Sequence, residues 1–131
     1  MASIIMDEVV RAPATTVWDA LSNVGAAHRV FAGVLSDCRL VAENTRIATF
    51  MNGLVVTERI ISIDAERKRL AYTVVSGGFE HHSASMLVLT HDEGTCRFVW
   101  TTDVLPDSAI DRVRPLMDAG TAALRRTFEP G

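Results

Sequence analysis

Three side chains in the middle of this 131-residue chain could act together on a carbonyl group. Arg59 could bind the carbonyl oxygen, Tyr72 could donate a hydrogen bond to it, and His81 could move protons near neutral pH. His81 is followed by His82, but neighbours on a strand point to opposite faces, so the pair does not predict a two-histidine metal site. These residues are therefore candidates for acid–base chemistry, and the histidine pair is not a candidate metal site.

Each of these residues also has a purely structural interpretation. His81 could be a strand-edge histidine beside the Gly77-Gly78 turn, and Arg59 could be a solvated charge on the outer face. Tyr72 could bury its ring and leave its hydroxyl in water. Glu58 takes the place of Arg59 if the strand parity is shifted by one residue. The residue types alone leave these alternatives open.

The elements that must position these residues follow from the spacing of apolar side chains. Apolar runs predict seven strands, at residues 3–10, 36–42, 46–51, 54–63, 70–75, 80–90 and 95–104. Helical spacing after Pro13 predicts two short helices between the first two strands. An apolar stripe from Ile110 to Phe128 predicts a long C-terminal helix. This order predicts a single α+β domain over residues 1–131, with a seven-stranded antiparallel sheet wrapped around that helix.

The turns determine which side chains face the C-terminal helix. An Asn-Gly pair predicts a two-residue turn that places Met51 opposite Leu54, and residues 91–94 predict a four-residue turn that places Thr90 opposite Thr95. Without a bulge, this register predicts the following inner residues: Arg59, Ile61, Leu70, Tyr72, His81, Ser83, Ser85, Phe98 and Trp100, with Val113, Met117, Gly120 and Leu124 from the helix.

Most of these inner residues are apolar and a few are polar, as in pockets that hold small molecules. The arginine, tyrosine and histidine named first are the catalytic candidates, and the others are expected to contact the ligand. Ser83 and Ser85 have no Ser-His-Asp context, so they do not predict a nucleophile. Trp100 is equally compatible with a packed core. Gly120 lies on the apolar stripe, where it either packs closely against the sheet or leaves room for a ligand.

The composition excludes several classes of protein. Thirteen basic and sixteen acidic residues give a net charge of −3, so the chain lacks the basic surface of a nucleic-acid-binding protein. It carries no phosphate-binding, dinucleotide-binding or calcium-binding motif, and no cofactor is predicted. Cys38 and Cys96 are isolated in the sequence and predict buried thiols rather than a disulfide or a zinc site.

The apolar content needs an explanation inside the protein. Hydrophobic residues make up 48% of the chain and the mean hydropathy is +0.19. No apolar run approaches the roughly 20 residues of a membrane span, so the surplus predicts either an unusually apolar core or an apolar cavity. No signal peptide is visible, which favours a cytoplasmic protein. One lysine against twelve arginines is typical of a GC-rich bacterial genome.

The order of the elements, together with particular residues, resembles the START-like (SRPBCC, helix-grip) superfamily. The matching stretches span nearly the whole chain and include residues 12–21 (APATTVWDAL), 57–64 (TERIISID), 69–72 (RLAY), 94–100 (GTCRFVW) and 117–124. The chain departs from many relatives at 27–31 (AHRVF), where they carry a Trp-Pro pair. The resemblance implies a helix-grip fold that holds a hydrophobic ligand between the curved sheet and the C-terminal helix, usually without a metal or cofactor.

We therefore expect the protein to bind a hydrophobic or aromatic small molecule, lipid-, polyketide- or quinone-like, in that cavity. The alternative is a polyketide cyclase or dehydratase whose cavity Arg, Tyr and His polarise carbonyls and transfer protons. A third hypothesis is regulation of a partner through a surface, with a cavity that has lost its use. An enzyme needs at least two titratable groups near one ligand atom, whereas a carrier needs few. Either a monomer or a homodimer is compatible with the sequence.

Overall fold

The alternating apolar residues form strands, and the apolar stripe forms a long helix, in a computed structural model that describes residues 2–131. The strands are β1 (Ala2–Val10), β2 (Leu35–Ala42), β3 (Thr45–Phe50), β4 (Val55–Asp64), β5 (Arg69–Val74), β6 (His81–Thr90) and β7 (Cys96–Leu105). The helices are α1 (Ala14–Leu21), α2 (Ala27–Val30) and α3 (Ile110–Phe128), with 3-10 turns η1 (Val24–Ala26) and η2 (Asp107–Ala109). Every predicted strand boundary lies within one residue of the observed one.

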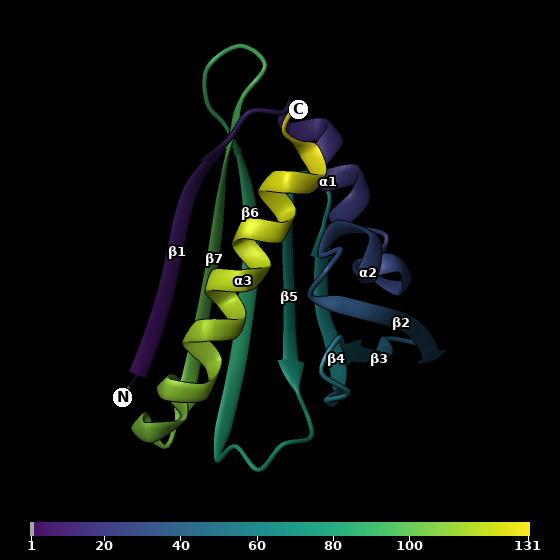
Figure 1. Cartoon of the computed structure of the whole chain (residues 1–131), viewed down its shortest axis with the longest axis vertical. Coiled ribbons are helices and arrows are strands. Elements are labelled where there is room, and N and C mark those ends of the chain that lie inside the picture. Colours follow the sequence, from purple (N-terminus) through teal and green to yellow (C-terminus); the bar gives the residue numbers. More distant parts are fainter. Residues whose placement is uncertain (1) are drawn as a thin grey trace.

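The seven strands form one antiparallel sheet in the order β1-β7-β6-β5-β4-β3-β2. Figure 1 shows α3 lying along the sheet. β2 and β3 turn across one side of the sheet, and α1 and α2 lie near the C-terminal end of α3. The sheet therefore wraps around the helix, and the predicted helix-grip fold is confirmed.

The core lies between the inner face of the sheet and the helices. One cluster joins α1 and α2 to the middle strands and includes Trp18, Phe98 and Leu124. A second cluster lies under the N-terminal half of α3 and includes Ile4 and Met117. Both clusters exclude water from the ends of α3, which fixes the helix over the sheet.

The pairing of β6 with β7 differs from the prediction by one residue. Thr90 pairs with Cys96 instead of Thr95, because the connection between the strands has five residues rather than four. A one-residue shift turns every side chain of a strand to the opposite face. β6 therefore directs Ala84, Met86 and Val88 into the core, and all three are buried.

Two further shifts correct the predicted faces of β3 and β4. Thr49, not Phe50, pairs with Val55, so the turn that contains Asn-Gly has three residues instead of two. In β4, Ser62 pairs with Ala71 but Ile60 pairs with Tyr72, which leaves Ile61 as the extra residue of a β-bulge. The bulge reverses the faces of β4 on the two sides of Ile61.

Candidate functional site

A cavity of about 340 Å³ lies between the inner face of the sheet and α3. Small-molecule sites typically measure roughly 300–1,000 Å³. Most of the wall is apolar, and its larger apolar residues are Phe31, Val34, Leu35, Phe50, Leu54, Val55, Val56, Val74, Phe79, Met86, Trp100, Val113, Leu116 and Met117. Polar side chains line it at fewer positions, including Arg46, Glu58, Tyr72, His82 and Thr102. Part of the apolar surplus in the sequence therefore lines a cavity.

Several predicted ligand-contact residues face this cavity. Tyr72, Trp100, Val113, Met117 and Gly120 line it. A Cβ atom on Gly120 would lie 2.9 Å from Trp100 Cζ3, so the glycine allows α3 to approach the indole ring closely. This confirms the first of the two explanations for the glycine in the apolar stripe. Two other predicted contact residues, Phe98 and Leu124, are fully buried in the core beside the cavity.

The remaining predicted site residues lie on the outer face, and their placement in the cavity was wrong. Arg59 and Ile61 are exposed, because the bulge at Ile61 turns Arg59 away from the side that Tyr72 occupies. His81, Ser83 and Ser85 lie outside because of the one-residue shift between β6 and β7. They line a shallower hollow on the outer face, where His81 Nε2 lies 3.1 Å from Ser83 Oγ.

A buried ion pair takes the place that the sequence analysis assigned to Arg59. Arg46 and Glu58 are paired directly across the β3–β4 ladder. Arg46 Nε donates to Glu58 Oε1 at 2.7 Å, and Nη1 donates to the Val24 carbonyl at 3.1 Å. Burial is the largest single effect and opposes the charge on Arg46, but the Glu58 carboxylate, together with Tyr72 and Cys38, outweighs it and raises the pKa of the guanidinium. The guanidinium therefore stays charged, and the contact gives each of two buried groups a partner.

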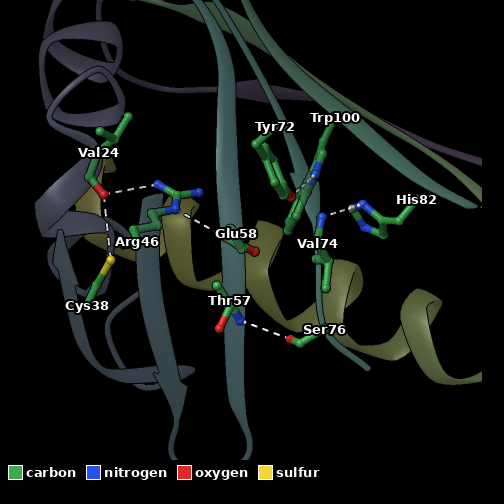
Figure 2. A network of polar contacts seen from close by, with 10 residues as sticks. All are labelled: Val24, Cys38, Arg46, Thr57, Glu58, Tyr72, Val74, Ser76, His82 and Trp100. Carbon is green, nitrogen blue, oxygen red and sulfur yellow. Dashed lines mark hydrogen bonds and ion pairs between the residues drawn. The ribbon is translucent and has the colours of Figure 1, made fainter. Parts of the chain in front are cut away.

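Tyr72 lies beside this pair and is held by Trp100. Trp100 Nε1 donates to the Tyr72 hydroxyl oxygen at 3.1 Å, and the Arg46 guanidinium carbon lies 5.4 Å from the centroid of the Tyr72 ring. Burial, and next the Glu58 carboxylate, raise the pKa of Tyr72 far above its ordinary value. The phenol is therefore neutral. Because its oxygen already accepts a hydrogen bond, its own proton is free to be donated to a ligand. Figure 2 shows these side chains gathered in front of α3.

His82 completes the polar wall, in the position that was predicted for His81. Its Nδ1 accepts a hydrogen bond from the Val74 amide at 3.0 Å, and its ring packs against Phe79 and Tyr72. Burial, and next the proximity of His81, lower the pKa of His82 to about 4. The imidazole is therefore neutral near pH 7. Since Nδ1 is the acceptor, Nε2 carries the proton.

The same histidine replaces part of the sheet ladder. Backbone pairing between β5 and β6 ends at Tyr72 and Ala84, although both strands continue beyond it. There, the Thr73 hydroxyl donates to the His82 carbonyl, and the Val74 amide donates to the His82 ring. Side chains, rather than backbone pairs, therefore join the two strands at the cavity (Figure 2).

Two polar contacts fix the loop between β5 and β6 at the cavity mouth. Arg112, from α3, donates to the Gly77 carbonyl at 2.8 Å and places its guanidinium carbon 4.2 Å from the Phe79 ring centroid. The Thr57 amide of β4 donates to Ser76 Oγ at 3.1 Å. The loop is therefore tied both to the helix and to the sheet.

Comparison with protein families gives a match over almost the whole chain. Residues 1–129 match the family described as polyketide cyclase / dehydrase and lipid transport. The chain belongs to this family. A comparison with curated protein sequences finds no match.

Solved structures share the fold of this family member. An uncharacterised protein of Bacillus thuringiensis is similar with a TM-score of 0.87 and 14% identity, over 97% of this chain and 98% of that one. The di-domain ARO/CYC BexL from the BE-7585A biosynthetic pathway has a TM-score of 0.82 and 18% identity, over 97% of this chain and 46% of that one. Norcoclaurine synthase from Thalictrum flavum, in complex with dopamine and hydroxybenzaldehyde, has a TM-score of 0.72 and 19% identity, over 95% and 84%.

The polar residues that line the cavity and that the prediction missed are Arg46, Asn52, Ser76, His82, Thr102 and Arg112. One signal could have found the first: Arg46 and Glu58 carry opposite charges and lie opposite each other once the Asn-Gly turn has three residues. The prediction of buried thiols at Cys38 and Cys96 is confirmed. Across residues 2–131, no helix is long and apolar enough to cross a membrane. Over the same range, no three His, Cys, Asp or Glu side chains are grouped to hold a metal ion.

Proposed function

We propose that this protein binds a hydrophobic or aromatic small molecule in the cavity between the sheet and α3. The cavity carries this proposal, because its volume of about 340 Å³ and its mainly apolar wall fit a ligand of that kind. Met86, Trp100 and Met117 offer apolar surface against which such a ligand would lose its hydration shell.

The polar wall supports a ligand with an oxygen acceptor at one end. Within the described residues Arg46 uses Nε and Nη1 in its hydrogen bonds, which leaves Nη2 for a ligand. The Tyr72 hydroxyl proton and the His82 Nε2 proton are also available. All three are donors, so a carbonyl or phenolate oxygen suits them.

Native mass spectrometry tests the proposal. Delipidated protein should take up one equivalent of an apolar or polyphenolic compound from a mixed set. Ala48 is buried and lines the cavity, so Ala48→Leu should fill it and reduce uptake at least about tenfold. Ala71→Leu is the matched control, because Ala71 lies on the outer face of the neighbouring sheet region. No uptake by the wild type, or equal uptake by Ala48→Leu, would contradict the proposal.

One observation favours a second function, cyclisation or dehydration of a poly-β-ketone chain. The ring centroids of Tyr72 and His82 lie 6.1 Å apart, and Arg46 lies against the other side of the polar wall. The Glu58 carboxylate could remove a proton from a methylene carbon between two carbonyls, while Tyr72 protonates the oxygen of the carbonyl that this carbon attacks. A carbon–carbon bond then forms, and water can leave in the next step.

This second function has its own test. Tyr72→Phe should slow formation of the cyclised product from a linear polyketone thioester about 100-fold while uptake of the substrate is retained. A wild-type protein that binds the thioester without converting it would leave binding as the function. Equal turnover by Tyr72→Phe would remove Tyr72 from the chemistry.

A further inference from the structure

Exposed apolar side chains cluster at the end of the sheet where the cavity opens. Met51, Leu54 and Val55 lie at the turn between β3 and β4, Val75 follows β5, and Leu105 ends β7. The antiparallel order brings these segments to one end of the molecule, which is the lower end in Figure 1. Leu54 and Val55 are exposed and also line the cavity, so the apolar wall continues without interruption onto the outer surface.

The charges around this opening are distributed unevenly. Neither the stretch from residue 47 to 57 nor the stretch from 70 to 79 contains a charged residue, in a chain that is 22% charged. Charged residues of both signs follow on the side of β6 and α3, namely Glu80, Asp111 and Arg112. A neutral surface therefore suits the uncharged, apolar rim, and the net charge of −3 does not favour an anionic surface.

Most backbone amides of the β3–β4 turn are hydrogen-bonded within the protein. The Met51 amide donates to the Val34 carbonyl, the Gly53 amide to the Phe50 carbonyl, and the Leu54 amide to Asn52 Oδ1. The Val75 amide is likewise paired, with the Thr57 carbonyl. Unpaired amides are costly in hydrocarbon, so pairing three of the four amides of residues 51–54 lowers the cost of moving the turn into an apolar phase.

We propose that the turn at residues 51–54, together with Val75, docks the cavity mouth on the surface of a neutral lipid bilayer. An apolar ligand would then pass between the bilayer and the cavity without crossing water. The inference rests on the proposed function, because it assigns the route by which that ligand enters. Strand addition by a protein partner does not fit here, because β3 and β4 are each paired on both sides.

Sedimentation with vesicles of phosphatidylcholine tests the docking surface without any ligand. Met51 and Val75 are 63% and 48% exposed, and neither lines the cavity. Ile5 and Ile63 are 64% and 46% exposed and lie away from the mouth, so they form a matched control. Met51→Ser with Val75→Ser should reduce vesicle binding about tenfold or more, and Ile5→Ser with Ile63→Ser should leave it unchanged.

A second reporter measures insertion directly. Tryptophan at Met51→Trp should be quenched by brominated lipids, and tryptophan at Ile5→Trp should not. Docking is overturned if the wild type does not bind neutral vesicles, or if both double variants bind equally. It is also overturned if binding requires anionic lipid. Ligand uptake from water, measured separately, shows whether the proposed function stands when docking fails.

Discussion

The Arg46–Glu58 pair makes a sharp prediction about stability. Its side chains are only 5% and 13% exposed, and 2.7 Å separates Nε from Oε1. Glu58→Leu leaves the Arg46 guanidinium buried with the Val24 carbonyl as its one remaining hydrogen-bond acceptor among the described residues. Removing one partner of a buried ion pair costs about 3–5 kcal/mol, and the adjoining cavity places this pair near 3 kcal/mol. That is a large share of the roughly 5–15 kcal/mol that stabilises a typical domain.

Urea denaturation followed by circular dichroism measures this loss. Arg46→Met combined with Glu58→Leu should recover most of it, because an apolar pair no longer contains an unpaired buried charge. The coupling energy from the double-mutant cycle should therefore be large. Asp7→Asn is the control, since it breaks the Arg97–Asp7 pair on the exposed outer face and should change stability far less. The reasoning is refuted if Glu58→Leu costs no more than Asp7→Asn, or if the two single losses simply add.

Three further predictions use other contacts of the site. Gly120→Ala should lower the free energy of unfolding by about 1–3 kcal/mol, because the new Cβ would overlap Trp100 and this strain exceeds the gain in helix propensity. Thermal melting measures the loss, and adding Trp100→Phe should restore part of it. Tyr72 is the only tyrosine and its pKa is raised, so native protein should show no tyrosinate absorbance at pH 10; an ordinary titration curve would contradict its burial. The pKa of His82 falls from 6.5 to about 4 on folding, so its contribution to stability is fully present above pH 6.5 and is lost as the pH falls to 4. His82→Asn should therefore make the unfolding free energy less dependent on pH between 4 and 6.5. An unchanged pH profile would refute the buried, neutral state of His82.

The sequence was sufficient for the fold and insufficient for the two faces of its strands. Apolar spacing located every strand, because burial of one face imposes alternation along its whole length. The faces depended on single residues: the fifth residue of the β6–β7 connection exchanged His81 for His82, and the bulge at Ile61 exchanged Arg59 for Glu58. Neither feature has a strong signature in the residues concerned, since each depends on how neighbouring strands twist and close around α3. Trp100 was placed correctly because β7 kept its predicted face. Tyr72 was placed correctly because the one-residue shift between β6 and β7 is cancelled by a second shift between β5 and β6, where Tyr72 pairs with Ala84.

The end of the β5–β6 ladder at Tyr72 and Ala84 divides the sheet into regions that should open independently. Beyond this point two side-chain contacts replace backbone bonds, so the lower ends of these strands can separate while β6 and β7 remain paired along their full length. Local opening of this kind occurs at lower free energy than global unfolding. We expect the Val74 amide to exchange its hydrogen sooner than the Met86 amide. We also expect the cavity to accept ligands of different widths, because β5 and β6 can separate beyond Tyr72 and Ala84.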